Sequence, residues 1–302
     1  MKNLLFGMLA MAAMVSCSSE NDPIDDVTGG KQDKVEIKLN AGVVGVETKA
    51  AVTAWDNTKV NFAKKGSTTF DEDWYATIGS DKKISFTESN FTTPQAHYYN
   101  NDGSNTTLVG YYPTENITRT ANEVSFEIPA NADMDIMSTA SQNGNKKVGE
   151  QFGEFTFNHL LTQLTFEVLS DAGYTGGYIT SIILKGTNRK AKLDLTNPSA
   201  LTFESLAAGN DITVYNGTIT PNGTAQSAGE AVMVQAGADM TLTIVAGSTT
   251  YENISIVTTE TDNKTKAGTS YKITLTFSGK TVSAEAGLTA WDTTGTGSGR
   301  IE

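Results

Sequence analysis

The stretch FTFNHLLTQLTFEV at residues 155–168 contains two apolar patterns that decide between helix and strand. Phenylalanines alternate with polar residues at 155–157, and the same period of two returns at 163–168. Successive side chains of a strand point to opposite faces, so this period predicts two strands, each with one buried face. A short helix over 157–163 is the alternative, although Leu160, Leu161 and Leu164 also suit the start of a strand.

Short alternating runs of the same kind fill the chain on both sides of this stretch. They are separated by Gly, Asn, Asp and Pro, with turn signals such as Asn222-Gly223 and Ser278-Gly279. We expect further strands within residues 35–39, 83–86, 108–112, 123–128, 178–184, 212–215, 231–234, 240–244, 253–257 and 271–277. The sequence therefore predicts an all-β protein made of antiparallel β-sandwiches.

The length of 302 residues suits one large domain or two ordinary ones. No Pro-rich or Ser-rich linker marks a boundary, and the most polar internal segment is residues 141–153. We expect four parts, which are a leader at 1–16, an acidic tether at 17–34, a first β-sandwich domain at 35–157 and a second at 158–302.

An apolar stretch at residues 4–15 follows the positive charge of Lys2. Its twelve residues, at about 1.5 Å each in a helix, reach roughly 18 Å, which is too short for a hydrocarbon core of about 30 Å. The stretch is therefore predicted to be an export signal rather than a membrane anchor.

The apolar stretch ends at Ser16 and Cys17, and Cys17 is the one cysteine of the chain. This ending resembles the lipobox of bacterial lipoproteins, in which the leader is cut before a cysteine that then carries lipid. The resemblance implies cleavage between Ser16 and Cys17 and acylation of Cys17, whereas an incidental cysteine in an ordinary leader is the alternative. The acidic stretch at 18–26 is typical of a solvated tether.

The charge and the scarcity of reactive side chains argue against several classes of function. With 22 basic and 34 acidic residues the chain carries −12 at pH 7, and no basic cluster suggests a nucleic-acid site. One cysteine excludes an intramolecular disulfide and cysteine-based metal sites. Two histidines leave few ways to build a catalytic triad, and we expect His159 to be a packing residue and His97 to lie in a loop or at a strand rim. Asp133 and Asp135 lack the spacing of a calcium loop, so we expect no metal, no cofactor and no enzymatic activity.

Motifs spread over nearly the whole chain occur in the order and spacing of a known family. The most telling is Phe-x-His-Leu-Leu-x-x-Leu-x-Phe at 157–166. The others are Cys17, IKLNA at 37–41, ETKA at 47–50, TAWD at 53–56, ADMDIM at 132–137, YKITLTF at 271–277 and Ala290-Trp291. Together they resemble the fimbrillin family of Bacteroidetes, the Mfa-like and FimA-like major-pilin superfamily.

This resemblance implies two transthyretin-like antiparallel β-sandwich domains in tandem. It also implies export as a surface-exposed lipoprotein of the outer membrane and assembly into fimbriae, which are pili that adhere to other cells. In that family an extracellular protease cuts after an Arg or Lys beyond the first strand. Lys49, followed by Ala50, is the matching residue here, and a Lys in place of the commoner Arg could change which protease acts.

Strand exchange between subunits, which the resemblance also implies, assigns a role to two further segments. The candidate displaced strand, residues 35–46, contains Val35, Ile37 and Leu39, and the candidate donor strand, residues 281–291, contains Val282, Ala284, Leu288 and Trp291. A sandwich that loses a strand exposes unpaired backbone groups and an apolar slot, and a partner strand repairs both. Because such a contact does not close on itself, repetition makes a filament.

The expected partners are other copies of the chain or related pilin subunits, a processing protease, outer-membrane lipid through Cys17, and an adhesion receptor on a host or bacterial cell. A surface lipoprotein that binds glycans or host ligands and never polymerises is the alternative. The 3 Trp, 10 Tyr and 12 Phe residues contain rings on which a sugar could stack, although aromatic residues on strands are core residues more often. An N-terminus that stays at Cys17 on cells would favour this alternative.

Overall fold

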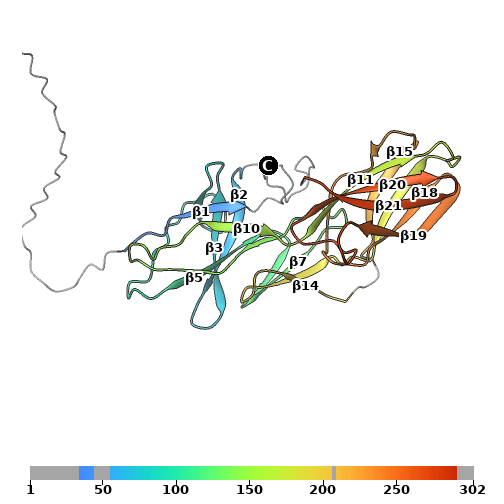
Figure 1. Ribbon diagram of the computed structural model, residues 1–302. Coiled ribbons are helices and arrows are strands. Elements are labelled where there is room, and N and C mark those ends of the chain that lie inside the picture. The colour runs from blue at the N-terminus through green and yellow to red at the C-terminus, as the bar shows by residue number, and fades with distance from the viewer. Residues whose placement is uncertain (1–33, 44–54, 206–208, 291–302) are drawn as a thin grey trace, which may run out of the picture. The chain divides into compact units, whose positions relative to one another are not determined.

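The computed structural model describes residues 34–43, 55–205 and 209–290 of the chain (Figure 1). These residues form twenty-one β-strands in three sheets and no helix. The predicted all-β fold class is confirmed, and the short helix considered for 157–163 does not form.

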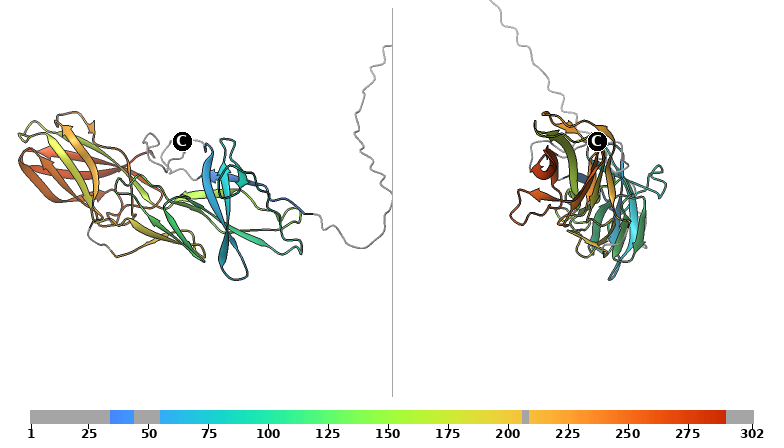
Figure 2. Two further views of the ribbon diagram at one scale, coloured as in Figure 1. Left: turned by 180° about the vertical axis from the view of Figure 1, so that it is seen from behind. Right: turned by 90° about the vertical axis from the view of Figure 1, so that its right-hand side faces the viewer.

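The first sheet contains eight strands, most of them from the early part of the chain. They are β1 (Leu39–Val43), β2 (Thr58–Lys65), β3 (Phe70–Ile78), β4 (Lys83–Thr87), β5 (Thr106–Tyr112), β8 (Met137–Thr139), β9 (Gln142–Gly144) and β10 (Phe155–His159). Their order is β2-β3-β4-β1-β10-β8-β5-β9, and a further pairing of β2 with β5 closes the seven strands from β2 to β5 into a circuit. The blue and cyan strands β2 and β3 lie side by side in both Figure 1 and Figure 2.

Aromatic side chains form the core of this sheet. Phe155 and Phe157 alternate with polar residues along β10, so both rings point to the same, buried face. The ring of Phe62 from β2 lies 5.1 Å from that of Phe155 and 6.1 Å from that of Phe157, edge to face in both pairs. Trp55 packs edge-on against Phe157 at 5.3 Å.

A four-stranded sheet combines two strands that precede residues 155–168 with two strands that follow them. Its strands are β6 (Ile117–Thr120), β7 (Glu123–Glu127), β13 (Lys190–Asp194) and β14 (Leu201–Phe203). They are ordered β14-β13-β7-β6, all antiparallel, and the central pair runs from Lys190 opposite Glu127 to Asp194 opposite Glu123.

The third sheet has nine strands from the later part of the chain. They are β11 (Thr162–Ser170), β12 (Ile179–Lys185), β15 (Ile212–Ile219), β16 (Gln226–Ser227), β17 (Val232–Val234), β18 (Thr241–Ala246), β19 (Thr249–Thr258), β20 (Ser270–Ser278) and β21 (Thr281–Leu288). Their order is β15-β12-β18-β19-β21-β20-β11-β16, and β17 also pairs with β11. Two of the pairs, β11 with β20 and β19 with β21, are parallel.

The expected boundary between residues 157 and 158 lies within β10, and the next strand, β11, belongs to the nine-stranded sheet. The buried residues Leu160 and Leu161 connect these two strands. Because β7 and β13 pair across the expected boundary, the division into two tandem transthyretin-like domains stays a prediction. The leader at 1–16 and the tether, apart from Lys34, lie outside the described residues.

Candidate functional site

The strand β1 lies between β4 and β10 and pairs along both of its edges. Leu39 is opposite Ile84 of the antiparallel β4, and residues 41–43 run parallel to residues 155–157 of β10. A strand held on both edges leaves two unpaired strand edges behind when it is removed. We call the place that β1 occupies between β4 and β10 the β1 slot.

The residues just before β1 extend the same attachment. The amide nitrogen of Ile37 donates a 2.8 Å hydrogen bond to the carbonyl oxygen of His97, and that of Tyr99 donates a 3.0 Å bond to the carbonyl of Val35. Glu36 lies opposite Tyr98 in an antiparallel bridge. The described part of the candidate displaced strand, residues 35–43, is thus held by backbone hydrogen bonds, and residues 44–46 lie outside the described residues.

Alternate side chains of this segment enter the core. Ile37, Leu39 and Ala41 are 2%, 4% and 0% exposed, and Val35 is partly buried. They belong to the same buried cluster as Phe62, Phe155 and Phe157. Removal of β1 would therefore uncover an apolar slot lined by aromatic rings.

A glycine at position 42 lies close to the side chain of Glu154. A Cβ atom on Gly42 would lie 2.1 Å from Oε1 of Glu154 and 3.5 Å from Oγ1 of Thr156. Sequence reasoning did not single out Gly42, although a glycine inside an alternating strand is a known sign of close approach by a neighbour.

Residues 281–288 of the candidate donor strand form β21 of the nine-stranded sheet. It is antiparallel to β20 along its full length, and residues 284–286 also run parallel to residues 256–258 of β19. Ala284 is buried, Val282 is partly buried and Leu288 is 53% exposed.

Five of the sequence-predicted site residues lie outside the described residues, namely Ser16, Cys17, Lys49, Ala50 and Trp291. In the sequence, Lys49 follows the last residue of β1 by six positions.

Both histidines pack against neighbours in the protein. The ring of His97 stacks on Trp74 with 3.9 Å between centroids, and its burial lowers the pKa of His97 to about 4. Nδ1 of His159 lies 2.6 Å from Oδ2 of Asp135, and both side chains are buried. His159 is therefore placed as a packing residue paired with a carboxylate.

Neither a metal cluster nor a membrane helix is present in the described ranges. No group of three or more His, Cys, Asp or Glu side chains there is placed to hold an ion. No helix among these residues is long and apolar enough to cross a bilayer.

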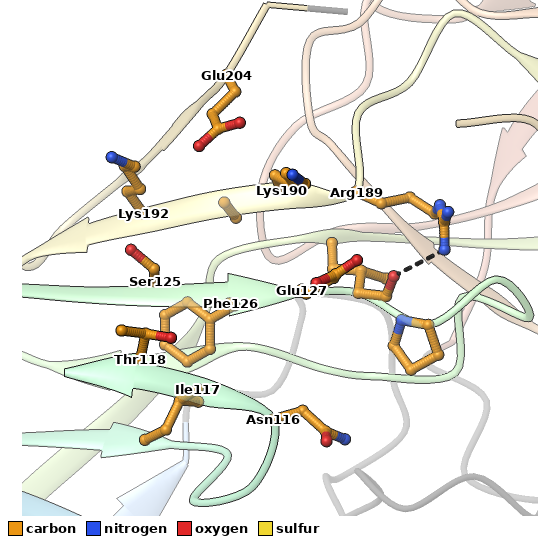
Figure 3. A pocket seen from close by; sticks show the side chains of 13 residues that line it. Asn116, Ile117, Thr118, Ser125, Phe126, Glu127, Arg189, Lys190, Lys192 and Glu204 are labelled. Carbon is orange, nitrogen blue, oxygen red and sulfur yellow. Dashed lines mark hydrogen bonds between the residues drawn. The ribbon is translucent and has the colours of Figure 1, made fainter. Parts of the chain in front are cut away.

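A polar hollow of about 620 Å³ lies on the four-stranded sheet (Figure 3). Charges of both signs line it, with Lys190 and Lys192 near Glu127 and Glu204. Arg189 at its rim donates a 3.2 Å hydrogen bond to the carbonyl oxygen of Ile128. The aromatic side chain among its described lining residues is Phe126, which is 2% exposed, so a sugar would find little ring surface for stacking.

The fold and the slot define an all-β protein whose core is completed by an early strand. Residues 46–291 match the fimbrillin-like family, so the chain belongs to this family. The resemblance noted in the motifs is thereby confirmed. A search of curated proteins finds no match.

Three solved structures share the fold at low sequence identity. A candidate cell adhesion protein from Bacteroides uniformis is 17% identical, with a TM-score of 0.60 over 86% of this chain and 99% of that one. A candidate cell adhesion protein from Bacteroides ovatus is 14% identical, with a TM-score of 0.60 over 86% and 98%. A fimbrial protein from Bacteroides vulgatus is 15% identical, with a TM-score of 0.52 over 84% and 99%.

Proposed function

We propose that the chain is a structural subunit of cell-surface fimbriae and polymerises by β-strand exchange. It is exported as a precursor that outer-membrane lipid holds through Cys17, and a protease then trims it after Lys49. The observation that carries the proposal is the position of β1, which pairs on both edges and inserts Ile37, Leu39 and Ala41 into the core. Membership of the fimbrillin-like family supports a fimbrial role.

The chain connection after β1 explains why cleavage would matter. In the precursor, β1 remains tethered to the following strand, so its effective concentration at the slot is high. A cut after Lys49 would leave β1 held by hydrogen bonds and packing alone. A strand of another subunit can then compete with β1 for the slot, because β1 is no longer covalently linked to the rest of the sheet. Such addition of a strand to a sheet is β-augmentation.

The incoming strand comes from another copy of the chain or from a related pilin subunit, and β21 is the candidate donor. A donor on one surface and a slot on another make a heterologous contact, which builds an open filament. The structural neighbours, a fimbrial protein and two cell adhesion proteins, support a surface location and an adhesive role.

We propose a structural rather than an enzymatic role. The placement of both histidines supports this, because His97 is stacked on Trp74 and His159 is buried against Asp135. Buried and paired side chains of this kind are poorly placed to meet a substrate.

The proposal is tested with the leaderless precursor and its Lys49→Gln variant, treated in parallel with a trypsin-like protease. We expect the native sequence to lose the fragment that ends at Lys49 and to form filaments visible by electron microscopy. The variant should keep its N-terminal segment, confirmed by mass spectrometry, and stay monomeric. Filaments of the uncut variant, or a cut protein that stays monomeric, would contradict the proposal.

A further inference from the structure

Three Asn-Gly pairs occur in the part of the chain that the structure describes, and the structure holds them differently. They are Asn143-Gly144, Asn216-Gly217 and Asn222-Gly223. The third pair lies in the connection between β15 and β16, whereas the other two lie within strands. All three asparagines are exposed, so solvent reaches each of them and the surrounding backbone is what distinguishes them.

Asn143 and Asn216 are held in paired strands. Asn143 of β9 lies opposite Thr107 of β5, and its Oδ1 accepts a 2.6 Å hydrogen bond from the hydroxyl of Thr107. Asn216 of β15 lies opposite Ser181 of β12. The peptide bond after each of these asparagines is part of a strand, so it can change conformation only when the local pairing opens.

The peptide bond between Asn222 and Gly223 has no such restraint. Residues 222–225 are exposed and belong to no strand. Among the described residues, no group accepts a hydrogen bond from the backbone nitrogen of Gly223. The Oδ1 atom of Asn222 accepts a 2.8 Å hydrogen bond from the backbone nitrogen of Thr224, so the side chain of Asn222 is turned towards the peptide unit that follows it.

We propose that Asn222 is a site of spontaneous covalent modification, at which the side-chain amide is converted to a carboxylate as the protein ages. This inference goes beyond the proposed function and does not depend on it. The geometry that carries it is an exposed Asn-Gly pair outside the strands, with the attacking nitrogen unbonded and the side chain turned towards it.

The reaction needs no reagent except water. The backbone nitrogen of Gly223 attacks Cγ of Asn222 and forms a new N–Cγ bond, while the bond from Cγ to the side-chain nitrogen breaks. That nitrogen leaves as ammonia, which carries away the proton lost by the nitrogen of Gly223. Water then opens the five-membered imide at Cγ to give aspartate, or at the backbone carbonyl carbon to give isoaspartate. One water is consumed, one ammonia is released, and nothing is oxidised or reduced.

Glycine at position 223 favours this attack, because it has no side chain to crowd the attacking nitrogen or to restrict the backbone. A Cβ atom on Gly223 would meet nothing within 4 Å, and the φ angle of Gly223 is not positive. Alanine therefore fits the same backbone at this position. The variant Gly223→Ala should slow ring closure and leave the fold unchanged.

The modification alters a contact between this connection and β11. The backbone nitrogen of Ser170 donates a 2.8 Å hydrogen bond to the carbonyl oxygen of Asn222. Isoaspartate adds a methylene group to the main chain at position 222 and turns this carbonyl into a carboxylate. Its charge has the same sign as that of Asp171, the residue that follows Ser170. Each modified subunit thus carries one more negative charge at the end of β11.

A time course on the leaderless precursor compares the three Asn-Gly pairs within one molecule. The folded protein is kept in mildly alkaline buffer, which favours loss of the proton from the attacking nitrogen, and samples are digested with a glutamate-specific protease. The digest contains residues 128–150 with Asn143, and residues 205–230 with Asn216 and Asn222. Fragmentation in a mass spectrometer locates each amide that has become an acid, and chromatography separates aspartate from isoaspartate peptides.

We expect Asn222 to convert at least about 10-fold faster than Asn143 and Asn216, the factor that corresponds to an opening free energy of about 1.4 kcal/mol for the paired strands. Both products should appear at position 222. In concentrated urea, which unfolds the strands, the three pairs should convert at similar rates. Equal rates at the three sites in the folded protein, or no conversion at Asn222, would overturn the proposal.

Anion-exchange chromatography of the intact protein provides a second readout. The native sequence should accumulate a more acidic species with time, and the variant Asn222→Asp marks where the aspartate product elutes. The variant Gly223→Ala should accumulate this species several-fold more slowly. Equal accumulation in Gly223→Ala and in the native sequence would contradict attack by the nitrogen of residue 223.

Discussion

Small residues at two positions of β1 set the shape of its slot. Ala41 is fully buried opposite Phe155, and Gly42 leaves room for the side chain of Glu154. The alternation of the sequence predicted the inward side of Ile37 and Leu39 correctly. The close approach of Glu154 to Gly42 could not be predicted, because Glu154 lies just before β10, which is far along the chain.

Protonation of His97 should destabilise the folded precursor. Burial lowers the pKa of His97 from 6.5 to about 4, so between these values the unfolded chain binds a proton that the folded chain does not. The free energy of unfolding should therefore fall as pH decreases from about 6.5 to about 4, by roughly 2 kcal/mol after allowance for partial exposure of the ring. Urea unfolding at a series of pH values measures this change.

The variant His97→Gln is the control for this prediction. It lacks the titrating ring, so its stability should vary less with pH over the same window. An unchanged slope would show that other groups cause the effect.

At the scale of elements, short alternating and apolar runs predicted many of the strands but not all of them, and β2 is one that they missed. In β2 the four residues Val60 to Ala63 are all buried, and Asn61 among them donates a 3.1 Å hydrogen bond from Nδ2 to the hydroxyl oxygen of Tyr111. A buried polar residue among apolar neighbours breaks the period of two, so the sequence of β2 does not indicate a strand. The parallel pairing of β1 with β10 could not be predicted from the sequence either. Periodicity indicates which face of a strand is buried, but it does not indicate which strand is adjacent.

The strand β1 should stabilise the precursor but not the filament. Leu39→Ala removes a buried side chain and should lower the free energy of unfolding of the uncut precursor by about 2–5 kcal/mol. The assembled filament should be unaffected, since the proposed exchange discards β1. Urea unfolding of the precursor and thermal dissociation of filaments measure the two effects.

Lys38→Ala is the matched control, because the Lys38 side chain is 83% exposed on the same segment. Its effect on the precursor should stay within about 0.5 kcal/mol. Equal losses from Leu39→Ala in precursor and filament would show that β1 is retained after assembly.

At the scale of the whole molecule, motifs and periodicity predicted the fold class and the family, and the match over residues 46–291 confirms the family. The order of the strands in the sheets could not be predicted from the sequence, because pairings such as β7 with β13 join segments that are far apart in the chain. The separation into two tandem domains, which the length and the family resemblance imply, stays a prediction.

A filament built by strand exchange requires that most of its subunits lack β1. The N-terminal residue of the protein in fimbriae sheared from cells, read by sequencing or mass spectrometry, tests this most directly. The account predicts a chain that begins at Ala50, without residues 17–49. Fimbriae whose subunits begin at an acylated Cys17 and keep an intact β1 would contradict it.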